Sequence, residues 1–75
     1  MRRRRRTARY LLCIRNDSYP ASLQTRRLYE HVSDKDAEAR GLVRVIDESG
    51  EDYLYPEKLF ATVKLPLPVV RAIAA

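Results

Sequence analysis

The sequence predicts an all-β fold of five short strands, and three observations point to this class. Asp47-Glu48-Ser49-Gly50 has Asp at the first and Gly at the fourth position of a type I turn, which is typical of a hairpin closed by a left-handed glycine and a bulge. β-Branched and aromatic residues flank this turn, and Pro56 ends the second flank. Before the hairpin, side chains alternate along residues 26–32 as they do in a strand.

The register of the hairpin decides which side chains face the core. In the bulged form Val45 lies opposite Tyr53 and Val43 opposite Tyr55, so two valines and two tyrosines share one face. A two-residue loop would instead place Leu54 with the valines, because a slip of one residue moves every side chain of a strand to the other face. We favour the bulged register.

The other elements follow from local signals along the chain. Ser33 with Asp36 three residues later resembles a capping box, and Gly41 suits the position after a helix end. Pro68 suits the first position of a terminal helical turn. We expect strands at residues 9–15, 26–32 and 60–64 besides the hairpin, and helical turns at 34–40, 57–59 and 68–75.

Alternation also predicts the core. The expected core residues are Leu12, Ile14, Leu23, Tyr29, Val43, Val45, Tyr55, Phe60 and Val63. Cys13 is expected to behave as a small buried hydrophobe whose thiol pKa is raised. Of the five tyrosines, Tyr29, Tyr53 and Tyr55 are expected to point inward, which leaves mainly Tyr19 exposed.

Charge divides the chain into a basic tail and a nearly neutral body. Six of the 15 basic side chains stand in residues 1–9, so the remaining 66 residues carry nine basic and ten acidic groups. Like charges without apolar neighbours predict a disordered tail at residues 1–8. Residues 9–64 then form the β domain, and residues 65–75 a C-terminal extension. One core of this size supplies only about 3–5 kcal/mol, which a partner or a weak homodimer would supplement.

Cysteine usage and hydropathy suggest a compartment. The single cysteine excludes an intramolecular disulfide and gives no sign of an oxidising environment, so a cytoplasmic protein is expected. The apolar residues at 10–14 are fewer than the roughly 7–15 of a signal peptide. No apolar run approaches the ~18 residues of a membrane span, so a soluble protein without membrane association is expected.

The order of elements resembles that of the Src-homology-3-like (SH3-like) barrel family. In that family, too, the distal hairpin leads into a proline-containing helical turn and a closing strand. The resemblance covers about residues 9–64 and implies a five-stranded barrel. Within it, Tyr19-Pro-Ala-Ser-Leu23 and Arg44-Val-Ile-Asp-Glu-Ser-Gly-Glu-Asp-Tyr-Leu-Tyr-Pro56 look like segments of small uncharacterised bacterial proteins of this shape. That second likeness implies no known activity.

Signalling members of the family bind proline-rich peptides in an aromatic groove that includes a tryptophan. This chain has no tryptophan, and the matching loop offers only Tyr19. Pro56 matches the family's proline, and Phe60 falls near the aromatic residue that follows it. We interpret Pro56, Tyr55 and Phe60 as residues that shape and fill the barrel rather than as a peptide groove.

Two functions of different class are compatible with these features. The first is a non-catalytic protein-interaction module that presents the loop of residues 16–27 to a protein partner, because binding residues concentrate on loops held by a rigid scaffold. The residues expected to contact the partner are Tyr19, Pro20, Arg26 and Arg27.

The alternative is a nucleic-acid-binding accessory protein, because guanidinium groups bind phosphates as bidentate donors. The residues concerned are Arg2, Arg3, Arg4, Arg5, Arg6 and Arg9. The same run also fits a solvated tail, a start upstream of a later initiation codon, or contact with an anionic membrane. The arginine run is also opposite in charge to the acidic hairpin tip. It would fold onto that tip either within one chain or between the two chains of a dimer.

We expect no catalytic activity, cofactor or metal. A Cys13–His31 dyad on adjacent strands has no glycine-rich oxyanion turn to support it. Together these two residues give at most two of the four ligands of a structural zinc site. The acidic tip at residues 47–52 lacks the alternating Asp pattern of a calcium loop and is expected to be a solvated turn.

Overall fold

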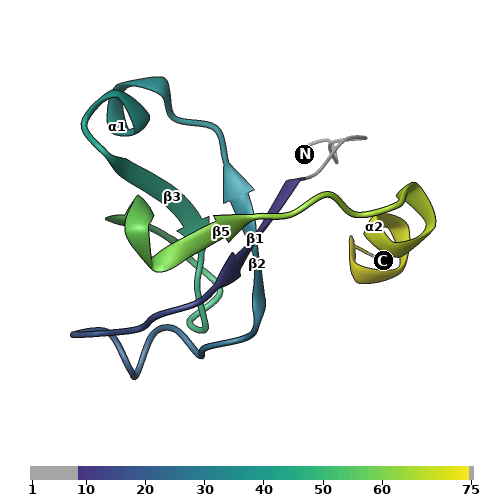
Figure 1. The fold of residues 1–75 in the computed structure, drawn as a ribbon, viewed down its shortest axis with the longest axis horizontal. Coiled ribbons are helices and arrows are strands. Elements are labelled where there is room, and N and C mark those ends of the chain that lie inside the picture. Colours follow the sequence, from purple (N-terminus) through teal and green to yellow (C-terminus); the bar gives the residue numbers. More distant parts are fainter. Residues whose placement is uncertain (1–8, 75) are drawn as a thin grey trace.

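Five antiparallel strands form a single sheet in the order β4-β3-β2-β1-β5 in the computed structural model, which describes residues 9–74 (Figure 1). Helix α1 lies between β2 and β3, the 3-10 helix η1 between β4 and β5, and helix α2 at the C-terminal end. The bounds are β1 Arg9–Cys13, β2 Leu28–Val32, α1 Lys35–Ala39, β3 Leu42–Ile46, β4 Asp52–Pro56, η1 Glu57–Leu59, β5 Phe60–Thr62 and α2 Leu67–Ala74. The all-β class with short helical turns is therefore confirmed.

The closed barrel expected from the sequence is not formed, because β4 and β5 are the two edges of the sheet and do not pair with each other. β5 has only three residues, and the segment that follows it contains Pro66 and Pro68, which lack the N–H groups a ladder needs. The space between the edges is filled by side chains instead. Leu23 and Leu59 are both fully buried there, in one cluster with Tyr55 of β4 and Phe60 of β5.

The hairpin has the predicted bulged register. Val43 pairs with Tyr55 and Val45 with Tyr53. Gly50 has φ of +87°, and its N–H donates to the Asp47 carbonyl at 2.9 Å, as a type I turn followed by a left-handed glycine requires. Leu54, the residue whose face depended on the register, therefore lies on the face opposite the valines.

Much of the predicted core is confirmed. The cluster consists of Cys13, Leu23, Tyr29, Val43, Val45, Tyr55, Leu59 and Phe60, with Leu11 and Tyr19 packed against it. Cys13 is fully buried, and burial raises the pKa of its thiol, as expected.

Four of the residues expected to point inward do not belong to this core. Ile14 is 49% exposed because β1 ends at Cys13, and the N–H groups of residues 14 and 15 both donate to the Leu59 carbonyl outside the strand ladder. Leu12 lies on the face of the sheet opposite the core and is half-buried. Val63 is also half-buried and lies beyond the end of β5. Tyr53 is 50% exposed because it sits on an edge strand next to the turn.

Helix α1 forms where predicted, but its cap differs. The N-cap is Asp34 rather than Ser33, and its carboxylate accepts a hydrogen bond from the N–H of Ala37 at 3.0 Å. Arg44 of β3 donates to the same carboxylate at 2.9 Å, which fastens the helix start to the sheet. Gly41 has φ of +78°, the left-handed conformation expected just after a helix end.

Helix α2 stands apart from the sheet at the end of an extended segment (Figure 1). Pro68 is its second residue, one position later than predicted. Its apolar residues Leu67, Val69 and Ile73 are between 40% and 50% exposed. Within residues 9–74 no helix is long and apolar enough to cross a bilayer. The predicted disorder of residues 1–8 lies outside the described residues.

Candidate protein-interaction site

Residues 14–27, here called the long loop, connect β1 to β2 and include all four residues expected to contact a protein partner. Two non-glycine residues among the described ones have positive φ, and both lie in this loop: Ser18 at 71° and Arg26 at 65°. A positive φ is unfavourable for a residue with a side chain, and it is kept only where contacts with the surrounding structure impose it. The long loop must therefore be held by specific contacts.

The base of the loop is held against β1. The N–H of Arg26 donates to the Cys13 carbonyl at 2.6 Å, and the N–H of Cys13 donates to the Arg27 carbonyl at 2.9 Å. β2 begins only at Leu28, two residues later than predicted, because the left-handed Arg26 interrupts the extended chain. The guanidinium groups of Arg26 and Arg27 are consequently displayed at the edge of the folded body, where both residues are exposed.

The tip of the loop forms a tight turn over the core. The N–H of Tyr19 donates to the Asn16 carbonyl at 2.8 Å, and the N–H of Leu23 donates to the Tyr19 carbonyl at 3.0 Å. The Asn16 side chain closes the same turn by donating to the Leu23 carbonyl at 3.0 Å. Leu23 is fully buried, so the turn is also anchored by a core side chain.

Tyr19 is not the free aromatic residue that alternation predicts. It is half-buried and packs edge-on against Tyr55, with ring centroids 5.0 Å apart and an interplanar angle of 90°. Pro20, next to it, is exposed. The structure therefore presents a fixed aromatic ring beside an exposed proline at the tip, and two arginines at the base.

A second set of contacts ties the loop to the hairpin turn through Glu48. The N–H of Glu48 donates to the Ser22 carbonyl at 3.0 Å. Its carboxylate accepts from the Tyr29 hydroxyl at 2.5 Å and pairs with the Nε of Arg27 at 3.1 Å. The Tyr29 hydroxyl in turn accepts from the N–H of Gln24 at 2.7 Å. Burial, and then the hydrogen bond to Glu48, raise the pKa of Tyr29 to about 12, so the Tyr29 hydroxyl keeps the proton that it donates to Glu48.

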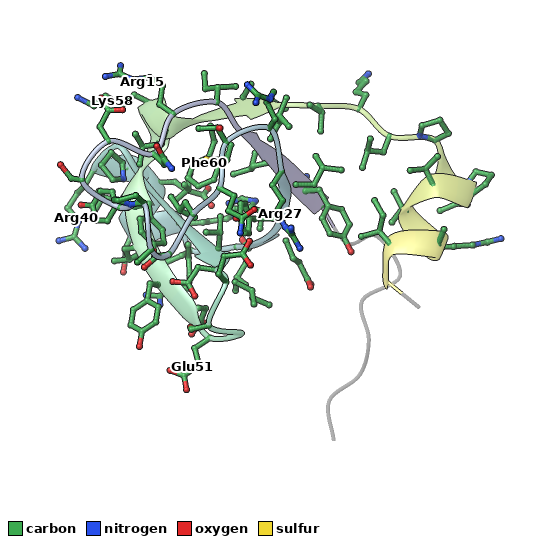
Figure 2. The ribbon with its side chains drawn as sticks, turned by 90° about the horizontal axis from the view of Figure 1, so that it is seen from below. Arg15, Arg27, Arg40, Glu51, Lys58 and Phe60 are labelled. Carbon is green, nitrogen blue, oxygen red and sulfur yellow. The ribbon has the colours of Figure 1, made fainter. Side chains whose placement is uncertain are left out.

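Asp47 forms a buried network next to this link. One carboxylate oxygen accepts from the Tyr55 hydroxyl at 2.5 Å, and the other accepts from the N–H and hydroxyl of Ser49 at 2.8 and 2.6 Å. Burial alone would raise the pKa of Asp47, but the hydrogen bonds from Ser49 and Tyr55 outweigh it and hold that pKa below its usual value. Asp47 is only 7% exposed, so the prediction of a wholly solvated acidic tip is wrong for this residue. Glu51, in contrast, points away from the sheet at the tip (Figure 2).

The structural contacts of Asp47 and Glu48 were missed by the sequence analysis. The available signal was that Tyr29 and Tyr55 were both expected to point inward, where a buried phenol needs a hydrogen-bond acceptor. The acidic residues nearest to them in sequence are Glu30 and Glu57, so sequence proximity does not identify Asp47 and Glu48 as the acceptors.

Most of the arginines expected to bind nucleic acid are not among the residues that the structure describes. Arg2 to Arg6 lie outside the described residues. Arg9 is described; it is the first residue of β1 and is exposed. The interaction of the basic tail with the acidic tip likewise involves residues outside the described range.

The Cys13–His31 pair is not brought together. His31 lies opposite Arg9, four positions along β1 from Cys13, which corresponds to about 13 Å at ~3.3 Å per residue. His31 instead contacts Glu38 of α1, with its Nε2 3.0 Å from a carboxylate oxygen. Among residues 9–74, no group of three or more His, Cys, Asp or Glu side chains is arranged to hold a metal ion.

Comparison of the chain with protein-family models, with curated proteins and with solved structures gives no match.

Proposed function

We propose that this chain is a non-catalytic protein-interaction module that binds a protein partner through the long loop. The observation that carries this proposal is the conformation of the loop. It contains both left-handed non-glycine residues of the described chain, and it is fixed at its base, at its tip and to the hairpin turn. Strained residues cost of order 1–3 kcal/mol each and cluster where a binding surface must be held in one shape.

A rigid loop also lowers the entropic cost of binding, because its residues are already ordered before the partner arrives. Tyrosine and arginine are the residue types that most often dominate interface energetics. The tip offers Tyr19 and Pro20, and the base offers the exposed Arg26, which forms no ion pair within residues 9–74. A partner surface that carries carboxylates and a shallow apolar patch would complement this arrangement.

The scaffold of this module is proposed to be an open form of the SH3-like arrangement. The hairpin β3–β4 leads through Pro56 and η1 into β5, and β5 pairs with β1. This is the sequence of distal hairpin, proline-containing helical turn and closing strand on which the resemblance rests.

Site-specific photo-crosslinking in the native host tests the proposed surface. A photoreactive phenylalanine analogue at position 20 is expected to yield one adduct of defined mass, whereas the same analogue at position 35, on the exposed side of α1, yields none. Arg26→Glu is expected to reduce the position-20 adduct at least tenfold, because it replaces the unpaired cation at the base of the loop. Arg40→Glu, an equal charge change at an exposed residue outside the loop, is the matched control.

Two results would overturn the interaction-module proposal. One is an adduct at position 35 as strong as that at position 20. The other is an equal loss of the position-20 adduct in the Arg26→Glu and Arg40→Glu variants, which would show a general charge effect.

The basic segment before β1 supports a second candidate, a nucleic-acid accessory function of residues 2–6. If about five phosphates are neutralised, the log–log salt slope is near −4.5, and binding to arbitrary duplex weakens roughly 500-fold between 50 and 200 mM salt. Fluorescence anisotropy with duplex and single-stranded oligonucleotides measures this slope. Replacing the five arginines of residues 2–6 by glutamine is expected to abolish binding; unchanged affinity in that variant, or no binding of the natural chain at 50 mM salt, contradicts the candidate.

A further inference from the structure

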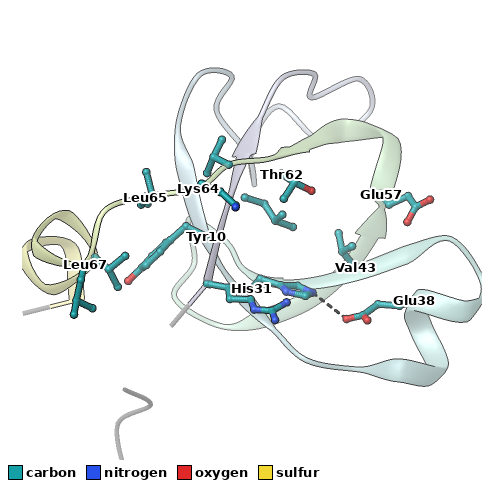
Figure 3. Close-up of a pocket in the computed structure, with 13 residues that line it drawn as sticks. Tyr10, His31, Glu38, Val43, Glu57, Thr62, Lys64, Leu65 and Leu67 are labelled. Carbon is teal, nitrogen blue, oxygen red and sulfur yellow. Dashed lines mark hydrogen bonds and ion pairs between the residues drawn. The ribbon is translucent and has the colours of Figure 1, made fainter. Parts of the chain in front are cut away.

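A cavity of about 640 Å³ opens at the end of the sheet opposite the long loop (Figure 3). Its floor comes from the core face of the sheet, where Leu11 and Val43 contribute. Its outer wall comes from Val63, Leu65 and Val70, which belong to the segment after β5 and to α2. A volume in this range is typical of sites that enclose most of a small molecule, and such sites combine apolar walls with a few polar groups.

The polar groups of the cavity include a row of basic side chains. Arg9 of β1 lies directly opposite His31 of β2, so the two share one face of the sheet. On the other side, β1 pairs with β5 in a register that places Leu11 opposite Thr62. Lys64 follows two residues after Thr62, beyond the end of β5. All three basic residues line the cavity.

Arg9 and Lys64 differ from His31 in having no acidic partner within residues 9–74. His31 contacts Glu38 at 3.0 Å, but within residues 9–74 neither Arg9 nor Lys64 takes part in an ion pair. The other carboxylate of the lining, Glu57, lies on the far side of the cavity from Lys64 (Figure 3). Arg9 and Lys64 line the same cavity, so an anion bound between these two like charges would be stabilised by both.

We propose that this cavity binds a small amphipathic anion, an alkyl carboxylate whose chain lies against the apolar walls and whose carboxylate is held by Arg9 and Lys64. We assign the site to a free small molecule for two reasons. The cavity has the volume of a small-molecule site, and both Arg9 and Lys64 line it. This site is separate from the long loop, so it is independent of the proposed protein-interaction surface.

Binding of octanoate, decanoate and dodecanoate to the full chain, below the concentrations at which they self-associate, tests the apolar part of the site. Affinity measured by titration calorimetry is expected to rise about fourfold per added methylene. Methyl groups of Val43 and Val70 are expected to show the largest NMR shift changes. Affinity that does not depend on chain length, or shift changes confined to other residues, would overturn the proposal.

Paired variants test the anionic part. The double variant Arg9→Gln with Lys64→Gln is expected to bind dodecanoate at least tenfold more weakly and to bind dodecanol unchanged. The double variant Lys35→Gln with Arg40→Gln removes the same charge from exposed positions outside the cavity and is expected to bind both like the natural chain. The basic tail is present in every variant, so its own attraction for anions cancels from the comparison.

Two results of these measurements reject an alkyl carboxylate ligand. One is equal weakening in the two double variants, which would assign the effect to net charge. The other is a ligand-free dimer, seen by sedimentation, that Val70→Asp dissociates and that takes up no dodecanoate. That result would assign the cavity to a second copy of the chain.

Discussion

Leu23→Ala is expected to remove most of the free energy of unfolding. Leu23 is fully buried in the main cluster although it belongs to a loop. Truncating a buried leucine to alanine costs about 2–5 kcal/mol, because both apolar contacts and packing density are lost. A single core in a body of this size supplies only about 3–5 kcal/mol, so the variant has little or no stability left. Urea denaturation followed by far-ultraviolet circular dichroism measures the difference.

Ile14→Ala is the matched control for Leu23→Ala, because it removes a side chain of the same composition from the same loop. Ile14 is 49% exposed, so its truncation is expected to change the free energy of unfolding by less than about 0.5 kcal/mol. Similar urea midpoints for the two variants would show that Leu23 does not anchor the loop in the core.

The effect of Leu23 bears directly on the proposed interaction surface. Tyr19 and Arg26, two of the proposed contacts, lie a few residues before and after Leu23 in the loop. Because the Leu23 side chain is buried in the core, it anchors the segment that carries both of them. The shape of the surface and the stability of the fold are therefore coupled. A partner that binds this shape would also stabilise the folded chain by mass action.

The hairpin was predictable from sequence because two residues specify its turn almost alone. Asp at the first turn position and Gly50 at the left-handed position leave one register compatible with the alternation of both flanks. The helical turns were predictable for similar reasons, since a capping side chain before α1 and Gly41 after it are local signals.

Other features depend on contacts between distant parts of the chain and left no local signal. The core face of β1 was assigned to Leu12 and Ile14, whereas Cys13 and Leu11 pack in the core cluster, because a run of apolar residues does not reveal which alternate set faces inward. Tyr53 satisfies the alternation and is still exposed, because it lies on the edge strand β4 next to the hairpin turn.

The candidate sites were predictable only in part. That residues 16–27 form a loop follows from their turn-forming residues, but the contacts of Glu48 with Ser22 and Arg27 require the hairpin turn and the loop to meet in space. The cavity was not predictable, since Arg9 and Lys64 line it together only because the first and last strands pair.

Tyr55→Phe is expected to destabilise the protein by about 1.5–3 kcal/mol, the range for a hydrogen bond to a charged group. Removing the hydroxyl leaves the buried Asp47 carboxylate without the donor that now lies at 2.5 Å. Tyr53→Phe removes a hydroxyl that donates to the exposed Glu51 at 3.2 Å, and no measurable change is expected there. Urea denaturation midpoints of the two variants measure this difference in stability, and each variant lacks one hydroxyl group.

The pH dependence separates a charged hydrogen bond from simple packing at Tyr55. The folded-state pKa of Asp47 is lowered, so its ionised form stabilises the fold above the unfolded value of about 3.9, and this contribution is lost as pH falls through the folded pKa. The destabilisation by Tyr55→Phe should therefore be full at neutral pH and shrink as the pH falls below about 4. A constant difference across that range would mean that the hydroxyl contributes through packing, and that the Asp47 network does not hold the hairpin turn in place.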